Sequence, residues 1–133
     1  MAFVQRLFQY LPVPVLSTIG REDSVSTTSP ALVEVGTSVD FEFKGGVYII
    51  GAGVTIAPVA GSFGTVEFLA GSDVVLSITL PNGASSRGGG LFVLNLSGVE
   101  TRHLAWRAMS DGVAPLDLSD LHFLVIAIGP PSA

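Results

Sequence analysis

The feature of this sequence that most constrains its fold is a series of short runs in which apolar and polar residues alternate. Val39, Phe41 and Phe43 are separated by Asp40 and Glu42, which is the spacing of a strand with one buried face. Similar runs follow at residues 66–68, 74–80 and 101–109, and continuous apolar runs stand at 91–94 and 123–128. Gly, Pro and Asn residues separate them. The pattern predicts an all-β chain of about eight short strands.

Short strands with turn signals between them are typical of two-sheet sandwiches, jelly rolls and barrels. We expect an antiparallel two-sheet sandwich or jelly roll. Gly45 and Gly46 lie between the runs at 39–44 and 47–50, which predicts a hairpin there. A separate short strand is expected at 54–56, and residues 115–121 predict a short helical turn capped by Asp or Ser.

The first 30 residues differ from the rest and define the expected organisation. Residues 1–16 form an arm in which apolar side chains recur near helical spacing, before Pro12 and Pro14 hold the chain extended. The arm either packs on the domain's own core or lies on a neighbouring subunit. Residues 17–30 are rich in Ser and Thr and predict a polar loop or linker, and residues 31–133 form the β-domain.

Composition indicates that much of the surface contacts other chains. Charged residues make up 13% of the 133 residues, whereas about 25% is usual for soluble domains. A small domain has a high ratio of surface to volume and should need more charge, not less. The shortage of charge therefore favours a subunit of a larger assembly, with a homo-oligomer expected.

Several function classes are disfavoured by charge and hydropathy. The net charge is −5 and the few basic residues are scattered, so we expect no nucleic-acid partner. No apolar stretch reaches 18 residues, and the first residues lack the pattern of a secretory signal. We therefore expect no membrane partner and synthesis in the cytosol. The chain has no cysteine, which excludes disulfides and thiolate chemistry.

Catalytic motifs are weak. A metal site could be drawn from His103, His122 and either Asp117 or Asp120, but we interpret His103 as a solvent-facing strand residue and the aspartates as turn residues. No Gly-x-Ser-x-Gly motif is present. We expect no enzyme activity, no cofactor and no metal.

The Gly-rich segment at residues 83–90 contains Arg87 and predicts an exposed loop. An alternative interpretation is a loop that orders against a partner chain, with Arg87 pairing to a carboxylate or to backbone carbonyls there. Trp106 lies on an alternating run and is expected to anchor the core.

The stretch VGTSVDFEFKGGVYIIGAGVTIAPVAGSFGTVEFLAGSDVVLSITL is rich in Gly, Ala, Val and Thr and poor in Lys. Over residues 31–128 the chain resembles the small capsid decoration (cement) proteins of tailed double-stranded DNA phages. The resemblance implies a structural virion protein on the capsid surface, commonly a trimer, that binds and stabilises the shell of major capsid protein.

The expected partner contacts come from five side chains, four of them in the apolar arm. They are Phe3, Leu7, Phe8, Leu11 and Arg87. The alternative function is a fibre or adhesin-type binding module that recognises a carbohydrate or a surface receptor. That function requires exposed aromatic side chains lining a groove, which Trp106 would have to supply.

Overall fold

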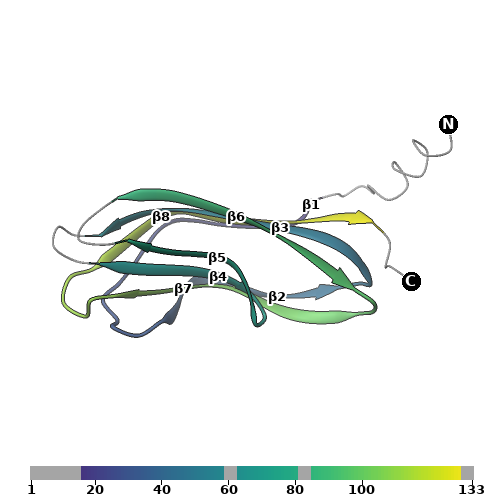
Figure 1. The fold of residues 1–133 in the computed structure, drawn as a ribbon, viewed down its shortest axis with the longest axis horizontal. Coiled ribbons are helices and arrows are strands. Elements are labelled where there is room, and N and C mark those ends of the chain that lie inside the picture. The colour runs from purple at the N-terminus through teal and green to yellow at the C-terminus, as the bar shows by residue number, and fades with distance from the viewer. Residues whose placement is uncertain (1–15, 59–62, 81–84, 130–133) are drawn as a thin grey trace.

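The computed structural model describes residues 16–58, 63–80 and 85–129 (Figure 1). Over these ranges the chain forms eight strands in two layers and no helix. The strands are β1 (Leu16–Thr27), β2 (Val33–Phe43), β3 (Gly46–Pro58), β4 (Gly64–Ala70), β5 (Asp73–Leu80), β6 (Ser86–Leu96), β7 (Glu100–Ser110) and β8 (Leu116–Gly129).

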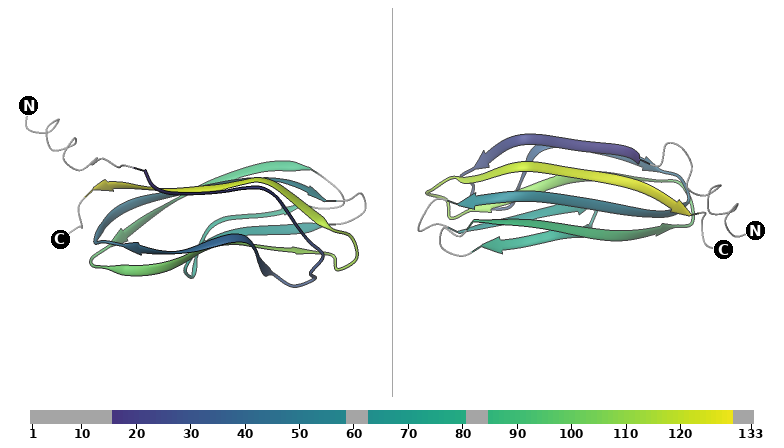
Figure 2. Two further views of the ribbon diagram at one scale, coloured as in Figure 1. Left: turned by 180° about the vertical axis from the view of Figure 1, so that it is seen from behind. Right: turned by 90° about the horizontal axis from the view of Figure 1, so that it is seen from above.

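The strands form two four-stranded antiparallel sheets. Sheet A has the order β1-β8-β3-β6, and sheet B has the order β2-β7-β4-β5. Figure 2 shows sheet A from above, with β8 and β3 in its centre. The chain passes repeatedly between the sheets, and β4 and β5 alone follow each other within one sheet among the described strands. This order is that of a jelly roll, which confirms the predicted fold class.

The core lies between the two sheets and is centred on aromatic side chains from both. Phe68 of β4 packs against Trp106 of β7, with ring centroids 4.9 Å apart, and against Phe123 of β8 at the same separation. Trp106 is 2% exposed, which confirms its prediction as a core anchor. Leu104 and Ala108 flank it on the same face of β7 and are fully buried. The alternation in the sequence therefore marks the inward faces correctly.

The hairpin predicted at Gly45 and Gly46 is wrong. Strand β2 pairs with β7 in sheet B, whereas β3 pairs with β6 and β8 in sheet A. The chain turns here from one sheet to the other, and Gly46 adopts a φ of 147°. Phe43 and Tyr48 meet across this corner with ring centroids 5.0 Å apart, and the Tyr48 hydroxyl donates to the carbonyl of Lys44 at 2.8 Å. A Gly-Gly pair permits a corner between sheets as readily as a hairpin.

Four segments are more extended than the sequence predicts. The polar loop at residues 17–30 is wrong over residues 17–27, which form the edge strand β1. The helical turn at 115–121 is wrong, because β8 begins at Leu116. The strand at 54–56 is part of β3, and residues 86–90 of the Gly-rich loop belong to β6. The arm at residues 1–16 lies outside the described residues apart from Leu16.

Two of these errors have a local physical cause. An edge strand bonds to one neighbour only and tolerates many polar residues, so the Ser-rich β1 shows little alternation. In β8 the inward positions Leu118 and Leu121 are three residues apart, because Asp120 adopts a φ of 51° between them. This irregularity breaks the period of two and imitates a helical spacing.

The packing around Trp106 predicts a large and specific effect on stability. Trp106→Ala should lower the free energy of unfolding by about 3–5 kcal/mol, because it leaves a cavity between the sheets. Denaturant unfolding at one fixed protein concentration measures this change. Val113→Ala is the control, since Val113 is 86% exposed and should change the value by less than about 0.5 kcal/mol. Equal effects of the two substitutions would show that the core is misplaced.

Candidate functional site

The outward-facing side of sheet B is mostly polar and carries several side-chain hydrogen bonds, although Leu69 of β4 and the 46% exposed Val74 of β5 also lie on it. Arg107 donates to Glu67 at 2.9 Å, and the hydroxyls of Thr65 and Thr79 lie 3.1 Å apart. Its outward side chains include Glu34, Asp40, Glu42, Thr65, Glu67, Ser77, Thr79, Thr101, His103 and Arg107. Such a face is suited to contact with water.

The outward-facing side of sheet A is apolar at the end where β8 finishes. Strand register aligns its side chains in rows across β8, β3 and β6. One row is Ile126, Ile49 and Val93, and the next has Leu124 and Leu91 on either side of Gly51. We call Val47, Ile49, Leu91, Val93, Leu124 and Ile126 the apolar face of sheet A.

Two side chains of the apolar face are strongly exposed. Leu91 is 75% exposed and Val93 is 62% exposed, and both lie on the edge strand β6. Exposed apolar residues scattered singly are normal on proteins, but a contiguous apolar patch marks an interaction site. The outer faces of the two sheets therefore differ in kind, and sheet A presents the candidate binding surface.

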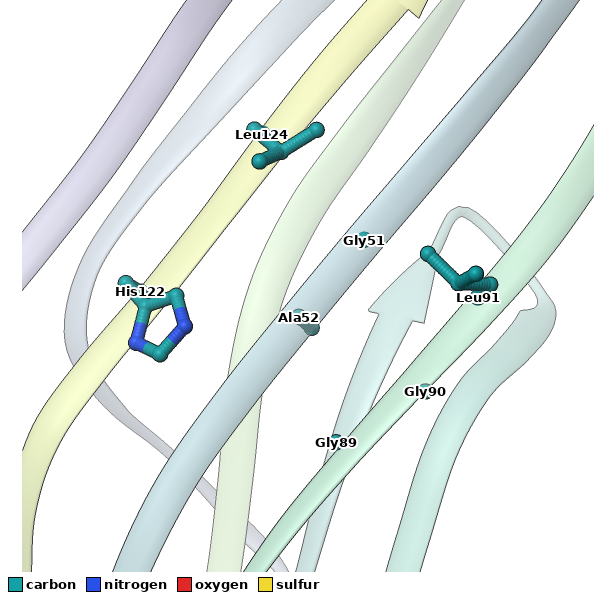
Figure 3. Close-up of a pocket in the computed structure, with 7 residues that line it drawn as sticks. All are labelled: Gly51, Ala52, Gly89, Gly90, Leu91, His122 and Leu124. Atoms are coloured by element: carbon teal, nitrogen blue, oxygen red, sulfur yellow. The ribbon is translucent and has the colours of Figure 1, made fainter.

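A shallow depression of about 560 Å³ lies within the apolar face (Figure 3). Its floor is formed by glycine backbone of β3 and β6 at Gly51 and Gly89, because no side chain rises there. Leu124 and His122 of β8 border one side, and Leu91 of β6 borders the other. A Cβ atom at Gly51 would lie 3.2 Å from a methyl carbon of Leu91, so a side chain there would crowd the depression.

The two histidines lie on outer faces of different sheets. His103 is on β7 of sheet B, and His122 is on β8 of sheet A, where its ring lies across Gly53. A metal site shared by both histidines is therefore ruled out by their positions. Within the described ranges, no group of three or more His, Asp or Glu side chains is placed to hold a metal ion.

His103 forms an exposed cluster with two carboxylates on sheet B. Its Nδ1 lies 2.6 Å from Asp40 and its Nε2 lies 3.0 Å from Glu34. Carboxylates only accept hydrogen bonds, so both ring nitrogens are satisfied when both are protonated. The hydrogen bonds to Asp40 and then to Glu34 raise the pKa of His103 above its ordinary value. The cluster is a structural ion pair between β2 and β7, and His103 is solvent-facing, as the sequence predicts.

The predicted partner residues are only partly within the described structure. Phe3, Leu7, Phe8 and Leu11 lie outside the described residues. Arg87 is exposed on β6, opposite Thr55 of β3, and its role in partner binding stays a prediction.

The residues of the apolar face were missed by sequence reasoning. Their signal was present: residues 91–94 and 123–128 are continuously apolar instead of alternating. A continuous run means that both faces of a strand are apolar. A continuous run does not show what covers the outward face. The strand order was needed to show that these two runs lie close together in one sheet.

Aromatic side chains do not form a platform on the apolar face. Trp106 and Tyr48 are 2% and 8% exposed and point into the core. Among the described residues, Phe63 is the large aromatic with substantial exposure, at 40%, and it does not border the depression. The groove that a carbohydrate-binding function requires of Trp106 is therefore absent from the described part of the chain.

No protein-family model and no curated protein sequence matches this chain. In structure it is similar to the VP2 subviral particle of infectious bursal disease virus, with 12% identity over 83% of this chain and 32% of that one, at a TM-score of 0.52. It is also similar to a triple jelly-roll protein of an archaeal virus, with 17% identity over 81% of this chain and 29% of that one, at a TM-score of 0.50.

A cyclase from Fischerella sp. TAU matches with 13% identity over 77% of this chain and 59% of that one, at a TM-score of 0.47. The chain thus spans less than two thirds of each of these three proteins. The two viral likenesses show that the jelly roll seen here is also found in viral structural proteins, and they show the fold alone. The described part of the chain offers no helix that could cross a membrane.

The His103 cluster predicts a measurable pH dependence. Because the pKa of His103 is higher in the folded chain, its pairing stabilises the fold fully below the ordinary pKa of 6.5 and is lost as pH rises through the folded pKa. An NMR titration of the His103 ring protons should report this raised pKa. The double variant Asp40→Ala, Glu34→Ala should lower it towards the ordinary value. The cluster is refuted if the pKa is the same in both proteins.

Proposed function

We propose that this chain is a structural subunit of a virion that works through protein–protein contacts. The observation that supports this most is the difference between the two outer faces. Sheet B presents mostly polar and charged side chains to solvent, with Val74 46% exposed among them, whereas sheet A presents the apolar face with Leu91 and Val93 more strongly exposed. A jelly roll with one apolar outer face is suited to lie against other subunits.

Association through this face would be driven by the area of apolar surface removed from water. Burial is worth about 25 cal/mol per Å² of apolar area, or about 1.5–3 kcal/mol for a large side chain that becomes fully buried. Six aliphatic side chains form the apolar face, with no charged side chain among them. A specific interface buries about 800 Å² on each partner, so two or three contacts would cover much of a small domain. This accounts for the low proportion of charged residues.

The more specific proposal is a decoration subunit that binds the shell of major capsid protein and stabilises it. The distribution of charge supports an orientation in which the outer face of sheet B is turned to solvent. The outer face of sheet B carries the acidic residues Glu34, Asp40, Glu42 and Glu67, and such a face would be repelled by packaged nucleic acid. In the proposed arrangement sheet B faces outward to solvent, and sheet A lies against the shell and against neighbouring copies in a homo-oligomer, with a trimer favoured.

The alternative binding module has less support. The depression on sheet A is bordered by Leu91, Leu124 and His122, and recognition of sugar rings depends on exposed aromatic faces and convergent polar groups. Aliphatic walls over a glycine floor are better suited to apolar side chains of a protein.

Self-association should depend on the apolar face. The full chain is expected to form a closed oligomer by analytical ultracentrifugation. The variant Leu91→Asp, Val93→Asp should weaken that association at least about tenfold, because burying an unpaired carboxylate costs more than the 1.4 kcal/mol that a tenfold change represents.

The matched control is Ser77→Asp, Thr79→Asp. These two residues are also exposed, two apart, and on an edge strand, but they lie on the outer face of sheet B. They should leave the association unchanged. A wild-type chain that stays monomeric at high concentration would contradict the proposed function. Large self-made particles in electron micrographs would favour a shell-forming subunit over a decoration subunit.

A further inference from the structure

The depression in the apolar face is shallow and is bordered by aliphatic side chains and one histidine. Its floor is the backbone at Gly51 and Gly89, and the side chains of Leu91, Leu124 and His122 stand around it. Methyl carbons of Leu91 and Leu124 lie 3.2 and 3.7 Å from the position of a Cβ at Gly51, so an occupant would lie across these side chains and would not descend to the backbone of Gly51. A segment with several apolar side chains on one side suits such a surface, because protein interfaces pack as densely as interiors.

The sequence supplies one such segment before β1. Residues 1–15 contain Phe3, Leu7, Phe8 and Leu11 at intervals that place them on one side of a helical turn. Arg6 is the single charged side chain in these 15 residues, and all eleven acidic residues follow later in the chain. The segment is therefore apolar and weakly basic, whereas the domain that it would bind is acidic.

The position at which residues 1–15 join the domain is also compatible with binding to a second copy. Leu16 begins the edge strand β1 and pairs with Ile126 of β8, at the end of sheet A that bears the apolar face. With residues 1–11 helical at about 1.5 Å per residue and residues 12–15 extended at about 3.4 Å per residue, the segment spans about 30 Å, whereas four strands side by side are about 15 Å across. The segment is long enough to reach a second copy and lie across its sheet A.

The same sequence argues against folding back onto its own sheet. Pro12 and Pro14 hold the residues before them extended. Gly, Asn and Asp are absent from residues 1–19, and these are the residues that most readily reverse a chain. Without Gly, Asn or Asp in this stretch, a sharp reversal back onto its own sheet is disfavoured.

We propose that residues 1–15 of one chain occupy the depression in the apolar face of a second copy, with Phe8 and its apolar neighbours against Leu91 and Leu124. This inference rests on the proposed function, because it takes the apolar face to be buried in an assembly. It adds that the arm binds another copy of this chain and not a different capsid protein. Passing an arm to the next copy is a heterologous contact, which makes a ring when the rotation between copies closes.

Cross-linking between single-cysteine chains tests the proposal, because the natural chain has no cysteine. Full-length Phe8→Cys and Leu91→Cys chains are mixed, unfolded and refolded together, and treated with a short bis-maleimide. The expected product is a covalent dimer of twice the chain mass, in which mass spectrometry joins the peptide of position 8 to that of position 91. Phe8→Cys mixed with Thr65→Cys is the control, since Thr65 lies on the outer face of sheet B, and it should give no such peptide.

The double variant Phe8→Cys, Leu91→Cys separates the two possible paths of the arm. If the arm lies on its own domain, dilute double variant gives a cross-linked species of single-chain mass and the mixed chains give no joined peptide; that outcome overturns the proposal. An oligomer without a joined peptide also overturns it and leaves the proposed function intact. A monomeric wild-type chain removes the proposed function itself.

Discussion

Two β-sheets of four strands each are stable here because each sheet buries one face against the other. The ring of Phe123 from sheet A packs on Phe68 from sheet B, and Phe68 packs on Trp106. Inward positions along every central strand supply aliphatic side chains around these rings. This contact uses only one face of each sheet, so the chemistry of the outer faces is free to serve something other than the fold.

The outer faces of the two sheets carry side chains of opposite character. Sheet B bears ion pairs such as Arg107 with Glu67 and His103 with Asp40, which interact well with water and contribute little to stability when exposed. Sheet A bears Leu91 and Val93, which lie outside the core. Their exposure to water is unfavourable, because burial of apolar surface lowers the free energy. A further protein surface that covers these two side chains would explain why apolar residues stand at exposed positions. The jelly-roll order places the continuous apolar runs of β6 and β8 on either side of β3, and so gathers them into one surface.

Sequence patterns predicted the layers of this fold better than its connections. Alternation at residues 39–43 and 101–109 identified strands and their buried faces, because period two follows directly from strand geometry. The partners of those strands depend on contacts between distant residues, and the Gly45–Gly46 turn gave no sign that it crosses between sheets. Strand β1 was missed because an edge strand needs few apolar residues. For the candidate surface, the sequence revealed an excess of apolar residues, but their assembly into rows across three strands required the observed register.

In the proposed assembly, the apolar face of sheet A is covered in the native protein. Maleimide labelling of single-cysteine variants measures this directly in the full chain. Val93→Cys should react about tenfold more slowly in the native protein than after unfolding, the protection that about 1.4 kcal/mol of burial gives, although Val93 is 62% exposed in the isolated chain. Ser77→Cys on sheet B should react almost as fast in the native protein as after unfolding. Equal and rapid labelling at both positions would contradict the account.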